Sequence, residues 1–146
     1  MQGWSDDGTL AGFDAVHLAT HAIFDGSHPL QSRILLSDGA LTVPDLFRLR
    51  LNARLVTLSA CQTALSALEP GDELLGLREA LLFAGANALL VSLWAVDDAS
   101  TGRLMASFYD RLLGGLAPAA ALASAQRQMR AAGESAFHWA PFVVIG

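Results

Sequence analysis

The residues of this chain best suited to chemistry are a cysteine and a histidine that each follow an apolar run. Cys61, the single cysteine, comes just after the run at residues 55–58, and His21 comes just after residues 16–19. A thiolate is a strong nucleophile, and a neighbouring imidazole can take the proton from the thiol. In open α/β sheets, reacting groups gather outside the carboxyl ends of the strands. The two positions therefore favour a Cys–His dyad at one edge of a sheet.

Both residues also have an ordinary structural interpretation. A lone cysteine commonly packs as a small hydrophobic residue, and a histidine at a strand end often satisfies a local hydrogen bond. Cys61 stands between an apolar strand and the polar pair Gln62 and Thr63, which is where a strand leaves the core. This context favours the dyad, but the two residues alone leave both interpretations open.

The elements that must position this pair alternate between strand and helix patterns. We expect strands at residues 14–20, 32–37, 54–60, 88–94 and 142–145, and helices at 44–48, 72–84, 98–113 and 118–132. Strands separated by helices predict right-handed crossovers and a mostly parallel sheet covered on both faces. At 146 residues the chain suits one α/β domain, with residues 1–13 as a lead-in.

Composition excludes several classes of function. A net charge of −5 and the lack of a basic stripe argue against nucleic-acid binding. No apolar run reaches the roughly 18 residues that span a bilayer, and no signal peptide is visible, so we expect a cytoplasmic protein. One cysteine excludes an internal disulfide framework and a cysteine-rich zinc site. His17 and His21 are weak evidence for a metal, and no Gly-rich phosphate loop follows a strand, so no metal or cofactor is predicted.

A collinear set of segments resembles the CHAT family, the caspase-like cysteine peptidase domains related to caspases and separases. The matching segments lie at residues 16–21, 36–37, 55–63, 71–77, 84–86, 92–98, 108–109 and 139–146. The resemblance implies a caspase-like three-layer sandwich, and it implies attachment to, or association with, tetratricopeptide repeats. Such domains commonly carry further strands before the histidine strand, so we expect this chain to lack them and to be part of a longer protein. A hydrophobic content of 53%, above the usual 45–50%, fits a missing partner.

The resemblance also implies roles for individual residues. Cys61 is expected to attack the scissile carbonyl, and His21 to act as base and proton donor. The backbone N–H groups of Cys61 and Ala22 would hold the oxyanion, although glycine commonly follows the histidine in this clan. Asp98 is expected to bind a basic P1 side chain and Asp97 to cap the following helix, with the reverse assignment still open.

Three classes of function remain at this point. The first is a caspase-like cysteine endopeptidase that cleaves a protein substrate, as a regulated module of a signalling or defence protein. The second is a catalytically silent caspase-like interaction module, which the alanine at position 22 suggests. A generic α/β ligand-binding domain is the third.

Overall fold

A mixed six-stranded sheet forms the middle layer of the protein. The computed structural model describes residues 3, 6–23, 25, 28–60, 75–95 and 97–146. The strands follow the order β3-β2-β1-β4-β5-β6 across the sheet. Their bounds are β1 (Ala15–Ile23), β2 (Arg33–Leu36), β3 (Gly39–Thr42), β4 (Leu55–Ala60), β5 (Leu89–Ser92) and β6 (Phe142–Ile145).

The three central strands run parallel, and the outer strands run antiparallel to their neighbours. β4 pairs in parallel with β1 on one side and with β5 on the other. β2 and β3 form an antiparallel hairpin beside β1, while β6 pairs antiparallel with β5. The predicted parallel sheet is therefore its core. A short connection joins the antiparallel strands β2 and β3, whereas β6 returns beside β5 only after α4, α5 and α6.

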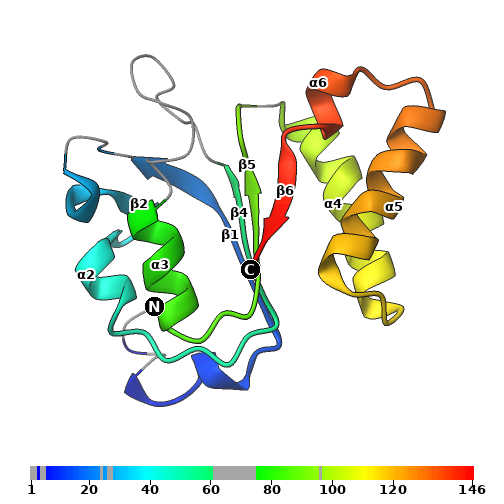
Figure 1. Ribbon diagram of the computed structural model, residues 1–146. Helices are drawn as coiled ribbons and strands as arrows, with labels where there is room; N and C mark the ends of the chain where they lie inside the picture. The colour runs from blue at the N-terminus through cyan, green and yellow to red at the C-terminus, as the bar shows by residue number, and fades with distance from the viewer. Residues whose placement is uncertain (1–2, 4–5, 24, 26–27, 61–74, 96) are drawn as a thin grey trace.

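Helices cover both faces of the sheet, as the alternating pattern predicted. Figure 1 shows α2 (Val43–Leu46) and α3 (Leu75–Phe83) on one side. On the other side lie α4 (Asp98–Leu113), α5 (Pro118–Ala131) and α6 (Ala136–Trp139). Two short 3-10 turns, η1 (Leu10–Gly12) and η2 (Pro29–Gln31), complete the described elements. The caspase-like α/β architecture expected from the sequence is confirmed.

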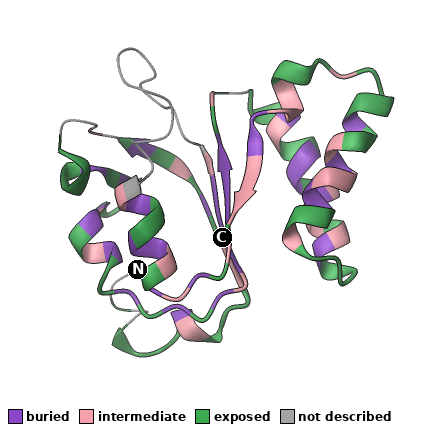
Figure 2. Cartoon of the chain, viewed as in Figure 1, coloured by how far each residue is buried: buried purple, intermediate pink, exposed green. Residues whose placement is uncertain are grey.

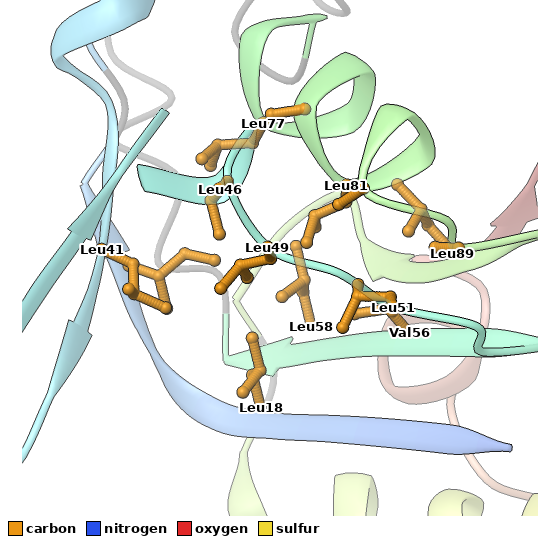
Figure 3. Packing of buried hydrophobic residues seen from close by; sticks show 14 of the residues in the cluster. Leu18, Leu41, Leu46, Leu49, Leu51, Val56, Leu58, Leu77, Leu81 and Leu89 are labelled. Atoms are coloured by element: carbon orange, nitrogen blue, oxygen red, sulfur yellow. The ribbon is translucent and has the colours of Figure 1, made fainter. Parts of the chain in front are cut away.

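Two hydrophobic clusters hold these layers together, one on each face of the sheet (Figure 2). The first joins the sheet to α2 and α3, and Figure 3 shows Leu18, Leu58, Leu77 and Leu81 packed within it. The second joins the sheet to α4 and α5, where Phe108 is fully buried. Each fully buried side chain of this size contributes about 1.5–3 kcal/mol relative to an exposed one.

β5 shows how one sequence segment serves both clusters. Leu89 and Val91 belong to the first cluster, whereas Leu90 belongs to the second. All four residues of β5 are buried, because alternate side chains of a strand point to opposite faces and helices cover both faces here. This explains the continuous apolar run that predicted a central strand.

Some boundaries differ from the sequence expectations. β1 continues past residue 20 to Ile23, because its last residues pair with β2 instead of β4. The strand β3 and the helix α6 were not predicted, since each has only four residues and no full period of its pattern. The supposed lead-in contributes to the core through Leu10, which is 3% exposed.

Local contacts define two of the helices. Thr42 caps α2 through a reciprocal capping box, in which its hydroxyl accepts from the Asp45 N–H and the Asp45 carboxylate accepts from the Thr42 N–H. Helix α4 spans the predicted residues 98–113 and buries Leu104, Met105, Phe108 and Leu112.

Candidate functional site

The carboxyl ends of β1 and β4 bring the two expected dyad segments to one edge of the sheet. The strands are parallel neighbours, with Leu18 opposite Leu58 and His21 opposite Ala60. Ala60 is the last residue of β4, and Cys61 follows it directly in the chain. Cys61 itself lies outside the described residues, so the contact between its thiol and His21 stays a prediction.

A β-bulge sets the direction of His21. Between the pairs at Leu18 and His21, β1 places Ala19 and Thr20 opposite a single β4 residue, Ser59. Bulges re-aim side chains and are over-represented beside active sites. Here the extra residue separates His21 from the face that Leu18 occupies, and His21 is solvent-exposed. An exposed imidazole at the end of the parallel pairing is accessible to a substrate.

Ala22 lies in the core on the opposite face from His21. Its side chain is 5% exposed and belongs to the same cluster as Leu18, and its backbone pairs with Ile34 of β2. None of the described residues other than glycine has a positive φ, so Ala22 is unstrained. The alanine that replaces the usual glycine therefore turns its methyl group into the core, away from the exposed side of His21.

The segment between β5 and α4 reaches the same edge of the sheet, because β5 runs parallel to β4. Asp97 is the N-cap of α4, and its Oδ1 accepts a hydrogen bond of 2.9 Å from the Ser100 N–H. This hydrogen bonding, with a smaller contribution from nearby His138, lowers the pKa of the Asp97 carboxyl. Asp98 is exposed in the first helical turn. The capping role expected for Asp97 is thus observed, while substrate binding by either residue stays a prediction.

A polar cluster on the α4 side of the sheet was not anticipated from the sequence. His17 Nε2 lies 2.7 Å from Ser59 Oγ, and its ring stacks on Tyr109 at a centroid distance of 5.6 Å. Tyr109 Oη lies 2.8 Å from the hydroxyl of Thr57, which is fully buried. The detectable signal was Thr57 and Ser59 alternating with apolar residues along β4, which places both on one face.

Partial burial shifts the two titratable groups of this cluster in the direction of their neutral forms. Removal of water from one side of the His17 ring lowers its pKa, although the residue as a whole is solvent-exposed. Burial raises the pKa of Tyr109, and the hydrogen bond with Thr57 opposes that shift. The cluster is therefore an uncharged hydrogen-bonded group beside the parallel strands at neutral pH.

His138 was not among the site residues predicted from the sequence. It belongs to α6, and its half-buried ring lies between the carboxylates of Asp97 and Glu134. No sequence pattern marks this environment, because α6 is a single turn that packs by tertiary contacts. His28 is exposed, and its Nδ1 lies 3.7 Å from Asp25 Oδ1.

Among the residues that the structure describes, no group of three or more His, Cys, Asp or Glu side chains converges as a metal site would require. No helix in the same part of the chain has the length and apolar character needed to cross a bilayer.

Comparison with known proteins gives a consistent result. The family model described as the CHAT domain matches residues 8–146. Tetratricopeptide repeat protein 28 of Mus musculus is 40% identical over 108 residues, which cover 73% of this chain and 4% of that protein. Tetratricopeptide repeat protein 28 of Homo sapiens is 37% identical over 113 residues, which cover 76% of this chain and 4% of that protein. The chain therefore spans a small part of the length of these relatives. With a family match over nearly its whole length and a caspase-like arrangement of strands and helices, the chain belongs to the CHAT domain family of the caspase-like clan.

Proposed function

We propose that this domain is a cysteine endopeptidase in which His21 activates Cys61. The observation that carries the proposal is the pairing of β1 with β4. It sets His21 opposite Ala60, the residue immediately before the single cysteine. The exposure of His21 adds to it, because a general base must reach both the nucleophile and the substrate.

The proposed reaction is acyl transfer through the thiol. His21 takes the proton of Cys61, and the thiolate attacks the scissile carbonyl carbon to form a tetrahedral adduct. The adduct collapses to a thioester as the C–N bond breaks and the imidazolium protonates the departing amine. Water, deprotonated by His21, then hydrolyses the thioester and releases the acid product with free thiol.

Backbone N–H groups at Cys61 and Ala22 would bind the oxyanion of this adduct. Loss of one such donor typically costs about 2.7–4 kcal/mol of transition-state stabilisation. Ala22 supplies an N–H as glycine would, and its methyl group is buried in the core. Its presence is therefore compatible with catalysis.

For the P1 side chain we propose a preference for Arg or Lys, bound by Asp98. A charge-assisted hydrogen bond of this kind contributes about 1.5–3 kcal/mol, whereas an acidic P1 residue would meet like charge. Peptide-library profiling should show a basic preference that falls strongly in Asp98→Asn and less in Asp97→Asn, since asparagine also caps a helix. A preference for acidic P1 residues, or a basic preference unchanged in both variants, would contradict this assignment.

Covalent labelling tests the dyad directly. We expect a peptidyl acyloxymethyl ketone with arginine at P1 to label the wild-type protein at Cys61, with the site identified by mass spectrometry. Labelling should disappear in Cys61→Ala and fall sharply in His21→Ala. His28→Ala serves as the matched control, because His28 is an exposed histidine outside the proposed machinery. Unchanged labelling in His21→Ala would refute the role of this residue.

A catalytically silent interaction module is the second candidate. It is favoured by the departure from glycine at position 22 and by relatives that are named for their tetratricopeptide repeats. We propose that such repeats are fused to, or associate with, the domain in either case. Because a free thiol nucleophile needs a reducing environment, we also propose a cytoplasmic location, which subcellular fractionation can test. The silent module predicts no Cys61 labelling by the probe in a folded protein.

A further inference from the structure

His138 lies at the centre of a charged group that joins the start of α4 to α6. Its Nε2 is 3.7 Å from Asp97 Oδ2, and its Nδ1 is 3.5 Å from Glu134 Oε2. These are ion-pair separations, longer than hydrogen bonds. The Nδ1 atom is shielded from solvent and makes no hydrogen bond within the described residues. A protonated imidazole presents an N–H at both nitrogens, so it can face both carboxylates at once.

Residues around His138, in the segment 137–141, also contact the residues that follow β5. Trp94 Nε1 donates a 3.0 Å hydrogen bond to the Phe137 carbonyl, and the two rings lie 6.0 Å apart. The Leu93 N–H donates a 3.0 Å hydrogen bond to the Pro141 carbonyl. We call residues 93–97 the β5–α4 loop. Its described residues are therefore tied to the segment 137–141 at both ends of the loop.

These contacts give the adjacent carboxylates of Asp97 and Asp98 different environments. Asp97 uses Oδ1 to cap α4 and directs Oδ2 at His138. On the far side, Glu134 is also held by Arg103, whose guanidinium donates at 2.7 Å to Glu134 and at 3.1 Å to the Ser100 hydroxyl. Asp97 thus uses Oδ1 in the helix cap and turns Oδ2 to His138, so the exposed Asp98 is the better placed of the two carboxylates to meet a cationic substrate group.

We infer that His138 is a positioning residue that sets substrate specificity by holding the β5–α4 loop against α6, so that Asp98 meets a basic P1 side chain. The inference rests on the proposed function for its specificity arm alone. The structural arm, immobilisation of the loop by His138, holds whether or not the domain cleaves peptides.

Amide hydrogen exchange measured by NMR tests the structural arm. The reporters are the N–H groups of Leu93, Ser100 and Thr101, which are hydrogen-bonded to Pro141 O, Asp97 Oδ1 and Asp97 O. In His138→Ala we expect exchange at these amides to become several-fold faster, while exchange in β4 stays unchanged. His138→Gln keeps one hydrogen-bond donor, so its exchange rates at these amides should lie between those of the wild type and those of His138→Ala. Arg127→Ala, at an exposed site on α5, is the control and should match wild type. Wild-type exchange at all three amides in both His138 variants would overturn the inference.

Kinetics with an Arg-P1 peptide test the specificity arm. We expect His138→Ala to raise KM several-fold with kcat nearly unchanged, because the substituted residue does not touch the reacting atoms. In the Asp98→Asn background the same substitution should have little further effect. Equal losses of kcat in both backgrounds would overturn the specificity role. Lack of probe labelling in the wild-type protein would instead refute the proposed function and leave the exchange result standing.

Discussion

At the scale of single residues, His17 has an environment that favours the neutral form of its ring. Its pKa is lowered by burial against Tyr109, so the unfolded chain binds a proton more readily than the folded one. Stability therefore falls as the pH drops through the ordinary histidine value of about 6.5.

This gives a first prediction for His17→Gln. The variant should lose less stability than wild type between pH 7.5 and pH 5.5, in urea unfolding at each pH, because glutamine does not titrate. The other three histidines are common to both proteins and cancel in the comparison. If the two stability curves run parallel across this range, the folded-state pKa of His17 is not lowered.

The hydroxyl pair of Thr57 and Tyr109 gives a second prediction. Thr57 is fully buried, so Tyr109→Phe removes the 2.8 Å partner of a hydroxyl that has no access to water. We expect a loss of about 1–3 kcal/mol in the free energy of unfolding. The double variant Thr57→Val with Tyr109→Phe should recover part of this loss, because both polar groups are then absent. A double variant whose losses are simply additive would contradict the coupling.

At the scale of elements, the first turn of α4 depends on one carboxylate. Asp97→Ala removes the cap on the Ser100 N–H and should cost about 1 kcal/mol in urea unfolding. Asp97→Asn should keep nearly wild-type stability, because asparagine caps equally well. Asp98→Ala is the neighbouring control and should cost less, since it affects only the helix dipole. Equal losses for the two alanine variants would show that the cap contributes little.

The turn between α3 and β5 depends on a glycine. Gly85 has φ +108°, and an added Cβ would collide with the carbonyl oxygen of Leu51. The comparison variant is Gly133→Ala, where φ is +80° but the space for a methyl group is open. Gly133→Ala should cost about 1–2 kcal/mol from backbone strain alone. Gly85→Ala should lower the melting temperature clearly more, and similar shifts for the two would show that the collision is relieved by movement of the chain.

At the scale of the whole molecule, the two hydrophobic clusters stabilise the fold, whereas the proposed chemistry depends on His21 and Cys61. Cys61→Ala deletes one sulfur atom from the residue that follows the last residue of β4 in the sequence, so we expect a change of about 1 kcal/mol or less in unfolding free energy. Any peptidase activity should nevertheless be abolished. Leu81→Ala, within the first cluster, is the contrasting variant and should cost about 2–5 kcal/mol. Full activity in Cys61→Ala would place the nucleophile elsewhere.

The arrangement of the whole molecule was predictable where one pattern ran for several periods. Helix α4 could be predicted because the stripe of Leu104, Phe108 and Leu112 recurs every four residues, and β5 because an unbroken apolar run needs two covered faces. The edge positions of His21 and Ala60 followed from where the apolar runs end. The environment of His138 was not predictable, because α6 is a single turn with no repeating pattern. His138 lies near Glu134, four residues earlier, and near Asp97, which is far away in the sequence. The bulge in β1 was equally invisible, since nothing in residues 18–21 marks a change of register.

The bulge means that the length of β1, and not only its composition, decides which way His21 faces. Side chains on a strand repeat every two residues, so one additional residue amounts to half a period. If Ala19 were deleted while Leu18 and Ala60 kept their pairing partners, His21 would turn to the face now covered by α2 and α3, and Ala22 would turn out to solvent. A lineage could therefore silence or restore this histidine by a single-codon insertion or deletion, with every residue of the proposed dyad still present in its sequence.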